Sequence, residues 1–221
     1  MKFKYLIFIF IFLICFIAFS CAPLEKKEID PARAWAIKES KATKATATLV
    51  AKFIAFELSL DKESTKTFVD AYVDERIKAG ERQEEVRTRG DRQFSIAVSR
   101  VNEQGFLRVI NKTLSPDQRK QAINIMRPDG MLGGSLTGSL DGSVNRLIRG
   151  KVGEKKIMKA MPILVKYLQQ FVALNAKAIS ERISREERMD MVIELRMATA
   201  KKLVSIIGED AAEYWLDLQT R

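Results

Sequence analysis

From residue 32 onwards, apolar side chains recur along the chain at steps of three and four residues. Between Ala32 and Leu60 the apolar positions are Leu49, Val50, Phe53, Ile54 and Leu58. This spacing places them on one face of an α-helix, and Asp30 and Pro31 stand before it in the N-cap and first helical positions that they favour. The stretch 61–79 repeats the pattern, and Gly80 is expected to end that second helix.

Two longer apolar stripes follow in the second half of the chain. One runs from Glu154 to Ile183, and the other covers 185–207 behind Ser184, which opens a capping-box pattern. Gly208 is the expected C-cap of the later helix. Methionines of that helix share their stripe with Val, Ile and Leu, so we expect them in the core rather than on a binding surface. The stripe consists of Met189, Val192, Ile193, Met197, Ala200, Leu203, Val204 and Ile207.

A glycine-rich segment separates these two parts of the chain. Pro128 to Gly153 contains six Gly between positions 130 and 150. One interpretation is a loop whose backbone amides bind a phosphate or another anion, but no Walker pattern is present. Short Gly/Ser runs are commonly linkers. We therefore expect 128–153 to be a loop between helices.

Together these patterns predict an all-α protein. Val, Ile and Phe alternate too little to indicate strands. We expect an antiparallel bundle of long helices in two helical halves, 30–127 and 154–221, joined by the Gly/Ser-rich loop. Close to the end of the chain, Tyr214 and Trp215 are expected to dock as an end plug.

The first twenty residues have a different character. Met1 to Lys4 carries two lysines, and the residues from Tyr5 to Phe19 are apolar throughout. A basic start, an apolar stretch of about fifteen residues and a small residue after it are typical of an export signal. The stretch is shorter than the ~20 residues that a spanning helix needs. We therefore predict that 1–20 is a signal peptide and that the chain is exported.

The end of this segment, Ala18-Phe19-Ser20-Cys21, resembles the lipobox of bacterial lipoproteins. In that family the signal is cut before the Cys, which then carries diacylglyceryl and acyl chains. The resemblance implies lipidation at Cys21, membrane lipid as a partner, a tether over 21–29, and a position facing the periplasm or the cell surface. Cys15 would leave with the signal, so the mature chain could form no intramolecular disulfide. The alternative is an uncleaved N-terminal anchor helix.

Composition restricts the chemistry that is open to the chain. It has no His, which removes Ser-His and Cys-His nucleophiles and His-ligated metal sites. Paired carboxylates remain, but adjacent helical residues do not face one site. The candidates are Glu84 with Glu85, Glu186 with Glu187, and Asp210 with Glu213. We expect no enzyme, no cofactor and no metal site.

The chain is basic, with 38 Lys and Arg against 28 Asp and Glu and a formal net charge of +10. Because export is expected, nucleic acid is not among the predicted partners. The charge favours anionic lipid headgroups, cell-wall polymers or acidic proteins. Basic and acidic residues are interleaved, so we expect solvated helix faces rather than one basic patch.

One helix start is unusually complete. In Leu114-Ser115-Pro116-Asp117-Gln118-Arg119, Ser115 is the expected N-cap, Pro116 the first helical residue and Asp117 an acid suited to the helix dipole. Gln118 is placed to bond back to the Ser115 amide, and Leu114 to act as a hydrophobic staple. Weaker copies stand at Leu60-Asp61-Lys62-Glu63-Ser64 and Ile183-Ser184-Arg185-Glu186-Glu187.

This motif resembles the LTXXQ motif of Spy/CpxP-type periplasmic proteins, and the resemblance covers about Ala55 to Met126. That family forms long, hooked antiparallel helices in a dimeric cradle and acts as an envelope stress chaperone or sensor. The resemblance therefore implies an ATP-independent chaperone-like role, a protein client and a homodimer. The departures are Ser64 in place of Gln in the earlier copy, and a second half that exceeds the usual family size.

Two binding hypotheses follow. A membrane-anchored, chaperone-like envelope lipoprotein predicts an exposed apolar or Met-rich surface. A structural or adaptor lipoprotein, bound to one envelope protein or to cell-wall polymer, predicts a closed, well-packed bundle with one specific interface.

Overall fold

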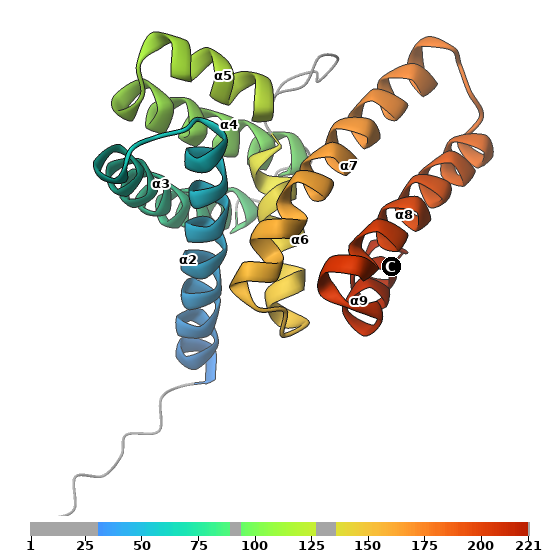
Figure 1. Ribbon diagram of the computed structural model, residues 1–221, viewed down its shortest axis with the longest axis horizontal. Coiled ribbons are helices and arrows are strands. Elements are labelled where there is room, and N and C mark those ends of the chain that lie inside the picture. Colours follow the sequence, from blue (N-terminus) through green and yellow to red (C-terminus); the bar gives the residue numbers. More distant parts are fainter. Residues whose placement is uncertain (1–30, 89–93, 127–135, 221) are drawn as a thin grey trace, which may run out of the picture. The chain divides into compact units, whose positions relative to one another are not determined.

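Every regular element of the computed structural model is helical within the residues that it describes, which are 31–88, 94–126 and 136–220 (Figure 1). These ranges contain eight helices and no strand, so the predicted all-α class is confirmed. In chain order the helices are α2 (Pro31–Glu57), α3 (Lys62–Thr88), α4 (Phe94–Thr113), α5 (Pro116–Met126), α6 (Thr137–Arg149), α7 (Glu154–Ser180), α8 (Arg185–Ile207) and α9 (Glu209–Thr220).

The chain divides into two units at a point inside α2. The first is Met1–Lys38 and the second is Glu39–Arg221. The second unit contains residues from both predicted helical halves and has one continuous hydrophobic core. Its largest fully buried side chains include Trp215, Tyr72 and Phe68. All contacts described below lie within this second unit.

Two antiparallel helix pairs form much of this unit. In the α3–α4 pair, Glu75 forms an ion pair with Arg108 and Arg76 a hydrogen bond with Asn102. Residue numbers therefore increase along α3 as they decrease along α4. α7 and α8 form the second pair, and α9 packs against α8 (Figure 1). α6 contacts α4, α7 and α9, which links the two pairs. Trp215 of α9 is fully buried and meets Tyr167 of α7 edge to face at 5.2 Å, as the predicted end plug requires, but Tyr214, the other residue of that prediction, is 39% exposed.

The predicted glycine-rich loop is wrong over 137–149, where the chain forms α6. Leu140, Val144 and Leu147 follow helical spacing and are buried, as is Leu136 directly before the helix, while Ile148 is partly buried. Gly138 lies against α4, where an added Cβ would stand 2.6 Å from Asn102 Nδ2. Gly138 therefore leaves room for the Asn102 side chain of α4, whereas a Cβ at Gly142 would meet no atom within 4 Å. The stretch 127–135 lies outside the described residues.

Gly80 does not end a helix as predicted. α3 continues through it to Thr88. A glycine inside an exposed helix costs about 1 kcal/mol relative to Ala, which the flanking turns can absorb. Glu, Gln and Arg dominate the residues after Gly80, and these are good helix formers.

Three helices end in the same turn although none has glycine there. Ser59, Lys151 and Arg182 have φ values of 51°, 59° and 54°, in the left-handed region. After each one, the next amide donates to the carbonyl five residues back: Leu60 to Ala55, Val152 to Leu147 and Ile183 to Ala178, each at 3.0 Å. These are Schellman motifs, with an apolar residue closing each turn.

Candidate functional site

The predicted lipidation site lies outside the described residues. Cys21, the rest of Ala18–Cys21, the signal 1–20 and the tether 21–29 all precede the first described position. Lipidation therefore stays a prediction. No described helix is long and apolar enough to cross a membrane.

The motif at the start of α5 forms a complete helix cap. The Ser115 amide donates to Gln118 Oε1 at 3.0 Å, and the Gln118 amide donates to Ser115 Oγ at 3.4 Å. Leu114 is buried in the core, Pro116 is the first residue of α5, and Asp117 lies in its exposed first turn. These five residues therefore have a structural role at one helix start.

The two weaker copies also cap helices. Asp61 accepts from the Ser64 amide at 2.8 Å and from its hydroxyl at 3.0 Å, and these hydrogen bonds lower the pKa of Asp61. Ser184 accepts from the Glu187 amide at 3.1 Å at the start of α8. The same cap therefore occurs at three helix starts: a short polar side chain accepts a hydrogen bond from the backbone amide three residues later.

The outer side of α8 carries an apolar stripe that sequence spacing placed in the core. Met189 is 42% exposed, Ile193 41%, Met197 49% and Val204 40%. The core prediction is therefore wrong for these four positions. It holds for Val192, Ala200, Leu203 and Ile207, which are buried.

The physical reason is the width of the apolar arc on α8. A helix turns about 100° per residue, so positions 193, 197 and 204 lie beside the buried positions and extend the apolar surface, while 189 lies on the same face as buried Ile207, five turns earlier. Among the described helices, α7 and α9 are the main neighbours of α8. They cover the inward part of the arc and leave the rest in solvent. We call Met189, Ile193, Met197 and Val204 the α8 stripe.

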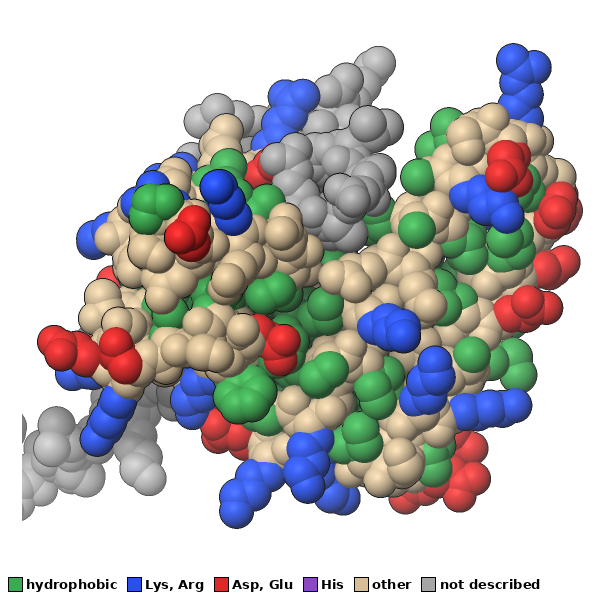
Figure 2. All heavy atoms as spheres, turned by 45° about the horizontal axis from the view of Figure 1, so that its top comes forward, with side chains coloured by type: hydrophobic (Ala, Val, Ile, Leu, Met, Phe, Trp, Pro, Cys, Tyr) green, Lys and Arg blue, Asp and Glu red, His purple; other side chains and the backbone are tan. Residues whose placement is uncertain are grey.

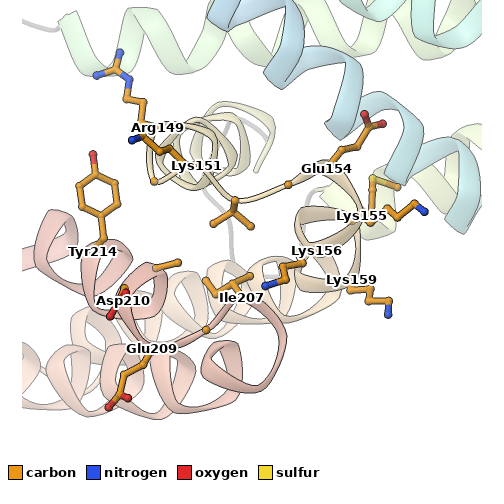
Figure 3. A pocket seen from close by; sticks show the side chains of 16 residues that line it. Arg149, Lys151, Glu154, Lys155, Lys156, Lys159, Ile207, Glu209, Asp210 and Tyr214 are labelled. Atoms are coloured by element: carbon orange, nitrogen blue, oxygen red, sulfur yellow. The ribbon is translucent and has the colours of Figure 1, made fainter.

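A groove of about 1480 Å³ opens where the α6–α7 turn meets the α8–α9 turn (Figure 3). Its apolar lining includes Val152, Met158, Ile207 and Ala211. Its cations are Arg149, Lys151, Lys155, Lys156 and Lys159, and its acids are Glu154, Glu209 and Asp210. Figure 2 shows Lys and Arg side chains along the lower edge of the molecule, with a group of Asp and Glu side chains at the right of that edge. The cations therefore outnumber the acids five to three around this groove.

A largely buried ion pair joins α6 to the α3–α4 pair, with 14% of the Arg76 side chain and 12% of the Asp141 side chain exposed. Arg76 Nη2 lies 2.5 Å from Asp141 Oδ2, and Arg76 Nη1 donates to Asn102 Oδ1 at 2.5 Å. Burial raises the pKa of Asp141 to about 6, because the opposing effect of Arg76 is smaller than the loss of water. Tyr72 is buried beside the pair, and burial raises its pKa well above the usual value.

A second carboxylate nearby has the opposite shift. Glu75 Oε1 accepts from Arg82 at 2.7 Å and from Arg108 at 2.6 Å. Partial burial alone would raise the pKa of Glu75, but the two guanidinium groups outweigh it and hold the pKa below its usual value. Four charged side chains therefore lie close together on the α3–α4 pair: Glu75, Arg76, Arg82 and Arg108. Their contacts are those of a structural network.

The carboxylate pairs named from the sequence do not converge. Glu186 and Glu187 are exposed in the first turn of α8, where the Glu187 amide completes a cap. Asp210 and Glu213 are exposed on α9, while the side chains of Glu84 and Glu85 lie outside the description. Within the described part of the chain, no three His, Cys, Asp or Glu residues are grouped so as to hold a metal ion.

The fold defines this chain as an all-α helical protein with helix pairs around one core. Comparison with protein-family models, with curated proteins and with solved structures finds no match for it.

Three features of the structure were not predicted from the sequence: the Arg76–Asp141 pair, the groove and the exposure of the α8 stripe. A signal existed for two of them. Seven Lys and Arg against one acid between 145 and 166 mark the groove. The stripe is marked by an apolar arc on the helix that is wider than a single neighbouring helix can cover. The ion pair has no such signal, because Arg76 and Asp141 stand 65 positions apart (141 − 76).

Proposed function

We propose that this chain is an exported lipoprotein, anchored in a membrane through Cys21, whose helical unit binds other proteins without catalysing a reaction. Facing the periplasm or the cell surface, it acts as an ATP-independent chaperone or a stress sensor. The basic and apolar residues 1–21 support the anchor. The resemblance at Leu114–Gln118 supports the chaperone-like role, although that motif on its own is a helix cap.

The observation that carries the binding role is the α8 stripe. It extends over 15 residue steps, which is about 22 Å along a helix at 1.5 Å per residue. Contiguous apolar surface left in water is typical of a surface that binds another apolar group. Two of its four residues are methionines, whose flexible side chains adapt to varied partners.

The alternative is a structural or adaptor lipoprotein that binds one envelope protein or cell-wall polymer. Its supporting observation is the tight packing elsewhere in the second unit. Ile54, Met126, Leu164 and Trp215 are fully buried in one continuous core.

The anchor is tested by mass spectrometry of the membrane-extracted protein. We expect the mature chain to begin at Cys21, to be heavier by a diacylglyceryl group, and to lose that mass in Cys21→Ala. An intact chain beginning at Met1 with no added mass would contradict the lipoprotein.

The binding role is tested by light scattering from an unrelated protein that aggregates on heating. We expect the chain to suppress the scattering, and Met189→Ser/Ile193→Ser/Met197→Ser to suppress it several-fold less. The matched control is Glu194→Ser/Ala198→Ser/Lys202→Ser. It places three serines at the same spacing on another side of α8, at exposed positions.

The two triple variants separate surface from stability. Both introduce three serines into one helix, so a loss in both would reflect a weakened α8 and contradict a role of the stripe. No suppression by the unmodified chain would contradict the chaperone-like role and favour the adaptor.

A further inference from the structure

Five exposed cations lie close together at one end of the second unit. They come from the end of α6, the turn that follows and the first turns of α7, and we call them the basic end: Arg149, Lys151, Lys155, Lys156 and Lys159. All five line the groove between the α6–α7 and α8–α9 turns. A cluster of this size on one surface creates a local positive potential that a net charge averaged over the chain does not reveal.

Acidic neighbours neutralise the basic end only in part. Glu154 lies within it, but its carboxylate is bound by Lys52 at 2.8 Å. None of the four lysines of the basic end forms an ion pair with a described residue. Glu209 and Asp210 stand in the first turn of α9, where the helix dipole stabilises them. Figure 3 shows Lys156 pointing into the groove and Glu209 extending away from it.

The groove beneath these cations has an apolar lining. Val152 of the α6–α7 turn, Met158 of α7 and Ile207 of α8 contribute to it. Lysine stems lie readily over apolar surface while their ammonium groups reach outwards. Cations around exposed apolar side chains suit the boundary between lipid headgroups and acyl chains.

The chain enters the second unit at this same end. Lys44 and Thr48 of α2 line a hollow together with Val152 and Glu154 of the α6–α7 turn. Lys44 is only five residues after Glu39, with which the unit begins. Cys21 precedes Glu39 by 18 residues (39 − 21). The basic end therefore lies on the same side of the second unit as the residues with which that unit begins.

We propose that the basic end docks against anionic lipid headgroups of the membrane in which the chain is anchored. The proposal rests on the anchor of the proposed function and adds an orientation. Lysines close to an anionic bilayer each strengthen the attraction, and the attraction decays within a Debye length. Docking at this end leaves the α7–α8 tip pointing away from the bilayer.

The test uses the full chain reconstituted in vesicles, with a fluorophore at Gly153→Cys or at Ser180→Cys. A Cβ at Gly153 meets no atom within 4 Å, and Ser180 is exposed at the end of α7. Both variants keep the natural cysteines, so the difference in quenching between them comes from the introduced cysteine. Vesicles of phosphatidylcholine, with or without phosphatidylglycerol, carry a nitroxide on a fraction of the headgroups, and quenching measures proximity.

We expect quenching at Gly153 to be at least twofold stronger in the anionic vesicles, and quenching at Ser180 to be weak in both. In 1 M salt, where the Debye length is about 3 Å, the quenching at position 153 should fall to the level seen in neutral vesicles. Lys155→Glu/Lys156→Glu/Lys159→Glu should abolish the gain. Lys62→Glu/Lys66→Glu/Lys120→Glu, an equal charge change at exposed lysines elsewhere, should retain it.

Three results would overturn docking while leaving the anchor in place. The first is equal quenching of the fluorophore at position 153 in both vesicle types. The second is an equal loss of the gain in both triple variants. The third is normal quenching in the basic-end variant together with loss of binding to an acidic polymer column. The last would assign the surface to an acidic polymer. A chain that floats with neither vesicle type contradicts the anchor itself, so the two failures are distinguishable.

Discussion

Single residues in this protein carry conformational strain at identifiable places. Ser59, Lys151 and Arg182 occupy left-handed backbone conformations that glycine adopts more readily, because their Cβ atoms crowd the following carbonyl group. In each case the turn is retained by the backbone hydrogen bond that closes it and by burial of the adjacent helix. The strain is therefore tolerated rather than required, and removing it should stabilise the fold.

Arg182→Gly is expected to raise the free energy of unfolding by about 0.5–1 kcal/mol, the relief of the left-handed strain less the extra chain entropy of glycine. Urea unfolding measures it. Arg182→Ala is the matched control, since it removes the same exposed side chain but keeps the Cβ. Equal stabilities of the two variants would show that φ at this position is not strained.

Asp141 makes stability depend on pH. Its pKa is raised to about 6 by burial, from 3.8 in the unfolded chain, so the folded state binds the proton more tightly between these values. Its contribution to the free energy of unfolding is complete below about pH 3.8 and is lost as the pH rises through about 6. The loss amounts to about 1.4 kcal/mol for each unit of pKa difference.

Asp141→Asn should therefore remove this part of the pH dependence. We expect the stability of the unmodified chain, relative to the variant, to decrease from pH 4 to pH 7 in urea unfolding. Ser139→Ala, a change at an exposed position of α6 that removes no titratable group, should leave the pH profile unchanged. Parallel profiles for the unmodified chain and Asp141→Asn would contradict the raised pKa.

At the scale of helices, glycine has opposite effects on stability at two positions. Gly80 lies on the exposed side of α3, and a Cβ there would meet nothing within 4 Å. Gly138 lies where α6 crosses α4, and a Cβ there would stand 2.6 Å from Asn102, which is itself bonded to Arg76. One glycine is therefore a weak point in a helix, and the other permits two helices to approach.

Gly80→Ala and Gly138→Ala make the same chemical change and should have opposite effects. We expect Gly80→Ala to stabilise the protein by about 0.8–1 kcal/mol through helix propensity. Gly138→Ala should destabilise it by about 1–3 kcal/mol through overpacking. Thermal or urea unfolding of both variants tests the pair. Equal effects of the two changes would contradict the close crossing.

The starts of the helices were easier to predict than their ends and contacts. Pro31, Pro116 and Ser184 mark starts because capping depends on a few adjacent residues, and the structure has helices beginning there. The end at Gly80 and the loop over 137–149 were wrong, because both depend on the neighbours of the glycine. Exposure of Met189 and Met197 depends on which helices pack against α8, and spacing within one helix cannot show that.

At the scale of the whole molecule, α6 joins the parts that sequence analysis separated. Its buried face includes Leu140, Val144 and Leu147, and its contacts reach α4 on one side and α7 and α9 on the other. Residues 39–221 accordingly form one compact unit. Because one core connects both helix pairs, they should lose their structure together.

We expect a single cooperative unfolding transition that Leu140→Ala shifts by about 2–5 kcal/mol. Fluorescence of Trp215, measured with Trp35 replaced by Phe, should follow the same curve as far-ultraviolet circular dichroism. Ser139→Ala, at the exposed neighbouring position, should cause little change. Two separate transitions, of which only one shifts, would indicate independent halves.

The amide of Leu136 donates to the carbonyl of Met126 at 2.6 Å, so the chain leaves α5 and returns to the start of α6 at almost the same point. Met126 and Leu136 are both fully buried, so the end of α5 and the start of α6 are held together in the core as well as through the chain that joins them.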